Sequence, residues 1–198
     1  AMQEAVPVGT GAMAAILGLD ATKVIAGCAE VTGAMAQNGT EVVEAVNFND
    51  PAQTVIAGTK AAVEKACEVL KAAGAKRALP LPVSAPFHSS LMKPAAEKLR
   101  VALAATALAT PQIPVLNNID VAVQQDADAI RDALYRQAFG PVRWVECVQA
   151  LKGRGISHII ECGPGKVLAG LVKRIDAELV GAALYDMNTL TATKELLA

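Results

Sequence analysis

The sequence has few of the residues that most often catalyse reactions or attract macromolecules. Its 198 residues include two histidines, one tryptophan, two tyrosines and three phenylalanines, and its formal net charge is −1. Because so balanced a charge offers no strong attraction to phosphates, we expect no nucleic-acid partner. No stretch of about 18 apolar residues is free of charge, so we expect no membrane-spanning helix, and we see no signal peptide.

The four cysteines lack the short spacings of a metal site. No two of them form a CxxC pair, and none has a histidine at ligand spacing. Each stands in an apolar stretch, so we interpret them as small, reduced core residues, which favours a cytoplasmic protein and no metal. They are Cys28, Cys67, Cys147 and Cys162.

Hydrophobic residues make up 53% of the chain, and residues 12–82 arrange them in a regular order. The expected order is strand, helix, strand, strand, helix, strand, with Asp20 as a helix N-cap, a turn at "DPAQ" and Gly74 just after a helix. This order is typical of the split βαβ, or ferredoxin-like, unit. The segments are "AMAAILGL", "DATKVIAGCAEVTGAMA", "EVVEAVNFN", "TVIAG", "TKAAVEKACEVLKAAG" and "KRALPLPV".

Residues 88–198 predict alternating helices and strands, as in part of an open α/β sheet. The strands are too few for a complete, independently stable layer. We expect Pro141 to open one helix and Asn188 to cap the last. The expected helices are 90–107, 127–139, 141–155, 166–175 and 188–198, and the expected strands are 113–118, 157–162 and 178–186.

The chain starts without an initiator methionine, and "AMQEAVPVGTG" reads like the last turn of a helix entering a loop. We therefore interpret the chain as part of a longer protein. Residues 1–7 would end a core helix, residues 8–83 would form the ferredoxin-like subdomain, and residues 84–198 would form the C-terminal part of an α/β core.

His88 is the residue best placed for chemistry. In "VSAPFHSSLM" it follows a predicted strand, at the end where open α/β sheets place their sites, and Phe87 beside it is an aromatic residue in a loop. Histidine is the usual general base for a hydroxyl or thiol nucleophile. A lone loop histidine is nevertheless more often structural, as we expect of His158.

No serine of the chain stands in a G-x-S-x-G elbow. Ser84, Ser89, Ser90 and Ser157 are all there are, and helix capping accounts better for Ser89 and Ser90 than a nucleophilic role does. The base thus lacks a partner within the sequence. The "GPG" at 163–165 could cradle a phosphate at a helix start or form a plain tight turn.

"RALPLPVSAPFHSSLMKPA" resembles the histidine segment of malonyl-CoA:acyl-carrier-protein transacylases and of the related acyltransferase domains of fatty acid and polyketide synthases. Five further segments occur in the same order in that family: "MQEAVPVGTGAMAAILGL", "VNFNDPAQTVIAG", "IPVLNNID", "IRDALYRQAFGPVRW" and "ECGPGKVLAGLVKR". The resemblance implies an α/β fold, with a ferredoxin-like subdomain and the C-terminal part of an α/β-hydrolase-like core. It also implies a cytoplasmic protein of fatty acid biosynthesis, without a cofactor and monomeric in its complete form.

The activity that this resemblance implies is malonyl transfer from malonyl-CoA to the phosphopantetheine thiol of acyl carrier protein, through an acyl-serine. By position, His88 matches the general base, and Gln137 matches the residue whose backbone carbonyl orients the imidazole. Asn47 and Asn49 match a loop near the pantetheine arm, and Phe87 matches a residue that favours malonyl over methylmalonyl groups. Without the resemblance, Gln137 would read as a solvated helix-end amide and the asparagines as turn caps.

The family's serine elbow, oxyanion loop and malonyl-binding arginine would all precede this sequence, so we expect the segment alone to be inactive. Two basic pairs, at 76–77 and 173–174, would suit an acidic carrier protein and the phosphates of CoA. The alternative is a non-catalytic ferredoxin-like module that binds a ligand or partner. An upstream G-H-S-x-G elbow would decide for the enzyme.

Overall fold

The computed structural model describes residues 2–7, 9–36, 39, 41–83 and 85–198. The chain divides into two compact units, Ala1–Trp144 and Val145–Ala198, and each contains a sheet of its own. The first residues of the two expected domains, 8 and 84, lie outside the described residues, as does the candidate Ser84. No helix in the described ranges is long and apolar enough to cross a membrane.

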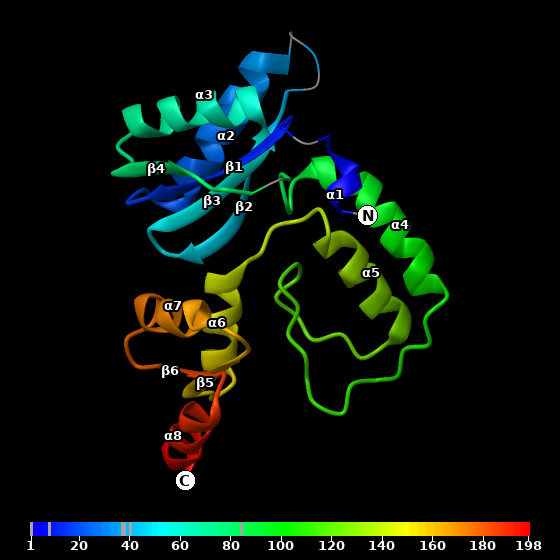
Figure 1. Ribbon diagram of the computed structural model, residues 1–198, viewed down its shortest axis with the longest axis vertical. Coiled ribbons are helices and arrows are strands. Elements are labelled where there is room, and N and C mark those ends of the chain that lie inside the picture. The colour runs from blue at the N-terminus through cyan, green and yellow to red at the C-terminus, as the bar shows by residue number, and fades with distance from the viewer. Residues whose placement is uncertain (1, 8, 37–38, 40, 84) are drawn as a thin grey trace. The chain divides into compact units, whose positions relative to one another are not determined.

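The first unit contains a four-stranded antiparallel sheet in the order β2-β3-β1-β4 (Figure 1). The two helices that connect these strands, α2 and α3, lie on one face of the sheet, and the elements follow the order strand, helix, strand, strand, helix, strand along the sequence. The elements are β1 Gly11–Leu17, α2 Ala21–Met35, β2 Val43–Asp50, β3 Gln53–Thr59, α3 Lys60–Ala72 and β4 Arg77–Pro80.

Local side chains fix the ends of these elements. The Asp20 carboxylate accepts a hydrogen bond from the Lys23 amide at 3.0 Å, which confirms the expected N-cap of α2. Gly74 follows α3 with φ 106°, a left-handed conformation that favours glycine, and the next amide, of Ala75, donates to the Leu70 carbonyl at 2.9 Å. Asp20 thus fixes the start of α2, and Gly74 fixes the end of α3.

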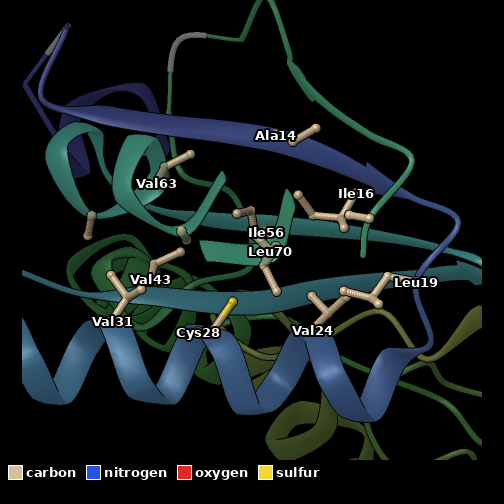
Figure 2. Close-up of a cluster of buried hydrophobic side chains, with 14 residues drawn as sticks. Ala14, Ile16, Leu19, Val24, Cys28, Val31, Val43, Ile56, Val63 and Leu70 are labelled. Carbon is tan, nitrogen blue, oxygen red and sulfur yellow. The ribbon is translucent and has the colours of Figure 1, made fainter. Parts of the chain in front are cut away.

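Buried side chains cover both faces of the sheet. On the α2 and α3 face, Ile16, Ile56 and Leu70 are 0% exposed, and Figure 2 shows Val24 and Cys28 pointing from their helix into the same cluster. The opposite face carries what we call the loop-side cluster, against which Leu81 and Phe87 also pack. Its buried members are Met13, Ala15, Val46, Val55 and Ala57.

The rest of the first unit is helical. It consists of α1 Met2–Ala5, the short 3₁₀ helix η2 Ser90–Met92, α4 Lys93–Ala104 and α5 Ala127–Gln137. Helices α4 and α5 lie side by side, joined by a hydrogen bond of 2.6 Å from the Tyr135 hydroxyl to the Glu97 carboxylate. A third buried cluster, which we call the helix-side cluster, is formed by Val6, Ala85 and Met92, with Phe87, Leu91 and Phe139 packed against it.

Two sequence predictions for this region were wrong. Residues 113–118, all of them described, form no strand beyond a single bridge between Leu116 and Val123, because Pro111 and Pro114 have no amide hydrogen to donate to a sheet. Pro141 does not open a helix either. Val142 is extended and pairs with β2 at Asn47, so the next helix begins only at Trp144.

The second unit contains a two-stranded parallel sheet, β5 His158–Cys162 paired with β6 Val180–Leu184. The helix between them, α7 Val167–Ile175, contacts both strands and buries Leu171 and Val172. Helix α6 is Trp144–Gly153, and helix α8, Met187–Leu197, contacts β6.

The expected N-cap of α8 was wrong by two residues. The carboxylate of Asp186, and not the side chain of Asn188, accepts a hydrogen bond from the Thr189 amide at 2.8 Å. The Asp186 amide in turn donates to the Thr189 hydroxyl at 2.9 Å. The reciprocal hydrogen bonds between Asp186 and Thr189 therefore set the start of α8, although Asn188 stands closer to the apolar residues of the helix.

Candidate active site

His88 lies in the loop that connects β4 to η2, with its backbone in a conformation rare for a residue other than glycine. Its φ angle is 65°, in the left-handed region, which costs about 1–2 kcal/mol for an L-residue with a β-carbon. Such strain persists only where the surroundings determine the conformation, and it gathers at functional sites. The neighbouring contacts show how the loop is held.

Hydrogen bonds hold the chain on both sides of His88. The Ser89 hydroxyl, fully buried, donates to the Pro86 carbonyl at 2.7 Å, and the Phe87 amide donates to the Ala85 carbonyl at 3.0 Å. Two residues after the histidine, the Ser90 amide donates to the Glu44 carboxylate of β2 at 2.6 Å. The expected capping by the side chains of Ser89 and Ser90 was wrong, since it is Glu44 that closes this helix start.

Phe87 anchors the loop through its ring. The side chain is half-buried and packs against both the loop-side cluster and the helix-side cluster. An aromatic ring between two buried clusters contributes apolar burial that sets the position of the next residue, His88. Phe87 is therefore a packing residue of the loop.

The structure brings His88 together with Gln137, from which 49 residues separate it. The imidazole Nδ1 atom lies 3.3 Å from the backbone carbonyl oxygen of Gln137. A carbonyl only accepts hydrogen bonds, so this contact requires the proton on Nδ1. The opposite nitrogen, Nε2, then has a free lone pair and can act as a base.

Gln137 can accept this bond because it is the last residue of α5, where carbonyls lack partners within the helix. The sequence alone suggested a solvated side-chain amide; in the structure the side chain is half-buried, and its oxygen accepts a hydrogen bond from the Asn118 amide at 3.0 Å. The backbone of one residue thus faces the histidine while its side chain holds the loop that follows Asn117.

Asn47 and Asn49 lie half-buried on β2, which carries bulges at Val46 and beside Asn49. Val142 joins the edge of β2 there, since its amide donates to the Val46 carbonyl at 2.8 Å. This pairing brings the chain that follows Gln137 to the strand that holds the asparagines. Within the described part of the chain, no hydrogen bond links either asparagine to His88.

The buried thiols and the Ser89 hydroxyl of the described residues are poorly suited to act as a nucleophile for His88. Burial raises the pKa of the Cys28 thiol to about 12, which keeps it protonated and inert. Burial also raises the pKa of Cys67. Cys147 is buried as expected, whereas the expectation of burial was wrong for Cys162, which is exposed. The Ser89 hydroxyl is already committed to Pro86.

The other candidates of the sequence are occupied by local contacts. The Glu161 carboxylate accepts from the Ala169 amide at 2.8 Å, so an acidic side chain fills the start of α7 where a phosphate would bind. His158 lies 2.8 Å from the hydroxyl of its neighbour Ser157. These contacts favour the plain turn for 163–165 and a structural role for His158.

Sequence reasoning missed the charged pair behind Gln137. Both carboxylate oxygens of Asp120 accept from the Arg136 guanidinium, at 2.7 and 2.8 Å. These hydrogen bonds lower the pKa of the Asp120 carboxyl and raise that of Arg136. Asp120 and Arg136 are 16 residues apart, and no regular spacing connects them. Only the position of Arg136 directly before Gln137 could have drawn attention to it.

Comparison with known sequence families places the chain. The pattern of the family described as "Acyl transferase domain" matches residues 2–182. The chain belongs to this family. The match covers the His88 loop, Gln137 and both asparagines, so every candidate site residue lies within the acyl transferase domain.

Relatives of this acyl transferase domain are named by their reaction. The chain is 54% identical over 195 residues to the malonyl CoA-acyl carrier protein transacylase of Escherichia coli (strain K12), covering 98% of this chain and 61% of that protein. A crystal structure of acyl-carrier-protein S-malonyltransferase from Burkholderia pseudomallei 1710b is 64% identical, with a TM-score of 0.92, and is covered to 61%. The chain therefore spans about three fifths of the length of these relatives and shares their mixed α/β fold.

A third relative has been solved with its partner. It is a malonyl-transacylase in complex with a type II PKS acyl-carrier protein, 51% identical with a TM-score of 0.93, and the match covers 98% of this chain and 61% of that one. The three comparisons agree on the acyltransferase fold over nearly the whole chain.

Proposed function

We propose that the protein containing this chain transfers a malonyl group from malonyl-CoA to the phosphopantetheine thiol of acyl carrier protein, in fatty acid biosynthesis. The observation that carries this proposal is the contact of 3.3 Å between His88 Nδ1 and the Gln137 carbonyl, which leaves Nε2 as a base. The names of the relatives supply the substrate and the acceptor.

In the first half-reaction, Nε2 accepts the proton of a serine hydroxyl supplied from outside these residues. The serine oxygen attacks the thioester carbonyl, the carbon–sulfur bond breaks, and the imidazolium returns its proton to the departing CoA thiolate. In the second half, Nε2 takes the proton of the carrier-protein thiol, the sulfur attacks the acyl-serine, and the serine oxygen leaves with that proton. The neutral Gln137 carbonyl would hold the ring through both halves without a buried carboxylate.

We assign the remaining sequence candidates to substrate contacts. Asn47 and Asn49 would lie near the pantetheine arm, and the bulges of β2 support this because they turn side chains out of the regular alternation. Phe87 would border the malonyl group. The basic pairs at 76–77 and 173–174 remain candidates for contacts with the acidic carrier protein.

We also propose that residues 8–83 are a ferredoxin-like subdomain and residues 84–198 the C-terminal part of an α/β-hydrolase-like core, with 1–7 ending a core helix. The strand order β2-β3-β1-β4, antiparallel throughout with both helices on one face, supports the first assignment. We further propose a cytoplasmic protein, monomeric in its complete form.

The test is malonyl transfer by the full-length protein, with each of the two histidines of this chain replaced in turn. His88→Ala should slow transfer by about 10²–10⁴-fold, the usual contribution of a positioned general base. His158→Ala is the matched control and should leave the rate within a few-fold. Equal effects of the two variants would contradict the role of His88.

A second measurement separates the enzyme from a binding module. Radiolabelled malonyl-CoA should label the full-length protein covalently and leave the isolated 198-residue chain unlabelled, because its buried Ser89 is already hydrogen-bonded. Reversible binding of malonyl-CoA without covalent label in the full-length protein would favour the non-catalytic module. Labelling of the isolated chain would point to a nucleophile within it.

A further inference from the structure

The carbonyl that faces His88 belongs to the end of a helix, where the backbone is least constrained. After Gln137 the chain leaves α5 through hydrogen bonds of 3.3 Å, from the Ala138 amide to Tyr135 and from the Phe139 amide to Arg136. Helix ends fray when nothing outside the helix holds them. The direction of the Gln137 carbonyl therefore depends on contacts beyond α5.

A loop formed by residues 117–122, which we call the Asn117 loop, supplies those contacts. Three consecutive residues of this loop contact the end of α5 and the residues that follow it. The Asn118 amide donates to the Gln137 side chain, and Ile119 packs against Gly140. The Asp120 carboxylate accepts hydrogen bonds from Arg136. A β-carbon on Gly140 would lie 2.3 Å from Ile119 Cδ1 and 2.9 Å from the Arg136 carbonyl oxygen, so a larger residue would have to displace the Ile119 side chain and would crowd the backbone at the end of α5.

The loop is itself rigid enough to act as a support. The Asn117 side chain accepts from the Asp120 amide at 2.7 Å and donates to the Ala122 carbonyl at 3.0 Å. The Asn117 amide donates to the same carbonyl at 3.0 Å, and Val121 takes a left-handed φ of 55°. Asp120 is thereby presented to Arg136 in a fixed orientation.

The strongest of these three contacts is the ion pair between Asp120 and Arg136. Arg136 donates from both terminal nitrogens to both oxygens of Asp120, the planar two-bond arrangement that gives direction as well as energy. The two side chains are only 36% and 26% exposed, so water screens the pair less than it screens the other ion pairs of α5. The Nε–H of the same guanidinium donates to Asp132, one turn earlier on the helix, at 2.7 Å.

We propose that Asp120 is a positioning residue for the general base. Through Arg136 it fixes the end of α5, so that the Gln137 carbonyl points at His88 Nδ1 and selects the tautomer whose Nε2 is unprotonated. Among the described residues, no hydrogen bond or ion pair joins Asp120 to the imidazole, so it acts through Arg136. This inference rests on the proposed function for its effect on turnover, but the tautomer of His88 is a property of the protein alone.

The experiment compares two carboxylates that share one guanidinium. Asp120→Ala removes the partner in the Asn117 loop, whereas Asp132→Ala removes the partner within α5 and is the matched control. Both are made in the full-length protein, labelled with ¹⁵N-histidine, and His88 is assigned by its loss in a His88→Gln variant. The ¹⁵N shifts of the neutral ring report which nitrogen carries the proton.

Asp120→Ala should lower the Nδ1–H share of His88 and reduce kcat for malonyl transfer by roughly tenfold with little change in KM, as second-layer substitutions commonly do. Asp132→Ala should change neither. An unchanged tautomer in Asp120→Ala, or an equal change in both variants, would overturn the inference.

Two further variants keep the test decisive if Asp120→Ala does not fold. Asp120→Asn preserves volume and one acceptor and should show a smaller shift of the same sign. Arg136→Lys preserves the charge but loses the fork, so it should resemble Asp120→Ala. A protein that transfers no malonyl group at all, yet shows the tautomer shift, would refute the proposed function and leave the positioning role standing.

Discussion

The two sheets of this protein differ in how completely their own unit covers them. In the first unit, the antiparallel sheet has a buried cluster on each face, and Ile16 and Ile56 are fully enclosed. In the second, β5 and β6 are a parallel pair whose residues are half-buried or exposed. Parallel sheets are normally covered on both faces, whereas antiparallel sheets tolerate less cover.

The candidate site lies in the unit whose sheet is more completely buried. All five site residues belong to the first unit, and the loop-side cluster that completes its core also holds Phe87, next to His88. A loop that is strained at one residue needs a rigid surface beneath it. The closed antiparallel core provides that surface, and the predictions below measure how far the two units differ.

The largest expected effect is on thiol reactivity in the 198-residue chain. With a pKa of about 12, Cys28 is ionised to only about 10⁻⁴ at pH 8, and it is buried, whereas Cys162 is exposed to the reagent. Alkylation followed by mass spectrometry should therefore modify Cys162 more than about 10³-fold faster than Cys28. Raising the pH should increase the rate at Cys28 about tenfold per unit until it approaches pH 12.

Cys147 makes the comparison between the units direct, because it too is buried but belongs to the second unit. We expect it to react faster than Cys28, since a sheet that is half-exposed opens more readily. Equal protection of Cys28 and Cys147 would mean that the second unit is as tightly closed as the first.

The next effect is on the free energy of unfolding. Ile56→Ala, at a fully buried position of β3, should cost about 2–5 kcal/mol in denaturant titrations followed by circular dichroism. The matched change Ile160→Ala, at a half-buried position of β5, should cost roughly 1–2 kcal/mol. If Ile160→Ala cost as much as Ile56→Ala, the proposed contrast in packing would be lost.

A smaller effect is expected at Phe87, which connects the buried clusters of the first unit to the candidate site. Phe87→Ser should shift the preference for malonyl-CoA over methylmalonyl-CoA by roughly 1–3 kcal/mol toward the methyl-bearing substrate, measured in competition with the full-length protein. Because the ring also packs on two clusters, the same variant should melt at a lower temperature. Phe87→Leu, which keeps most of the apolar contact, should melt closer to the unchanged protein. An unaltered substrate ratio in Phe87→Ser would remove Phe87 from the substrate contacts.

Sequence reasoning succeeded where short-range rules decide the structure. The element order of residues 12–82, the Asp20 cap and the Gly74 helix end follow from periodicity and from contacts within a few residues. It failed at 113–118, where apolar residues suggested a strand but Pro114, within the segment, and Pro111, just before it, have no amide hydrogen to donate to a sheet. The burial predicted for Cys162 was wrong because apolar neighbours in the sequence do not reveal whether the last residue of a strand is buried or exposed.

The candidate site could not have been assembled from local patterns. His88 stands out by its place after a strand, but its acceptor lies 49 residues away, and the family resemblance alone suggested Gln137. The left-handed backbone of His88, the Glu44 contact with Ser90 and the Asp120–Arg136 pair depend on segments that only the fold brings together. The catalytic roles of His88 and Gln137 stay predictions until the variants are measured.

The smallest expected effect asks whether the two units also differ in their local caps. Asp20 caps α2 in the first unit and Asp186 caps α8 in the second, each through an amide three residues on. Backbone hydrogen bonds, from Lys23 and from Thr189, lower the pKa of both carboxyls. A lowered pKa in the folded state means stability that is present above the unfolded value, about 3.9, and is lost as the pH falls through the folded value.

Asp20→Ala and Asp186→Ala should therefore each lower the melting temperature slightly at pH 7, and the loss should shrink below about pH 4 as the wild-type carboxyls become protonated. Both carboxylates accept an amide hydrogen bond at the surface, and Asp186 accepts a second one from the Thr189 hydroxyl at 2.8 Å, so the loss for Asp186→Ala should be only slightly larger than that for Asp20→Ala. Similar losses would locate the difference between the units in the packing of their sheets. A much larger loss for Asp186→Ala would instead mean that the second unit depends on its helix ends because its core holds it less firmly.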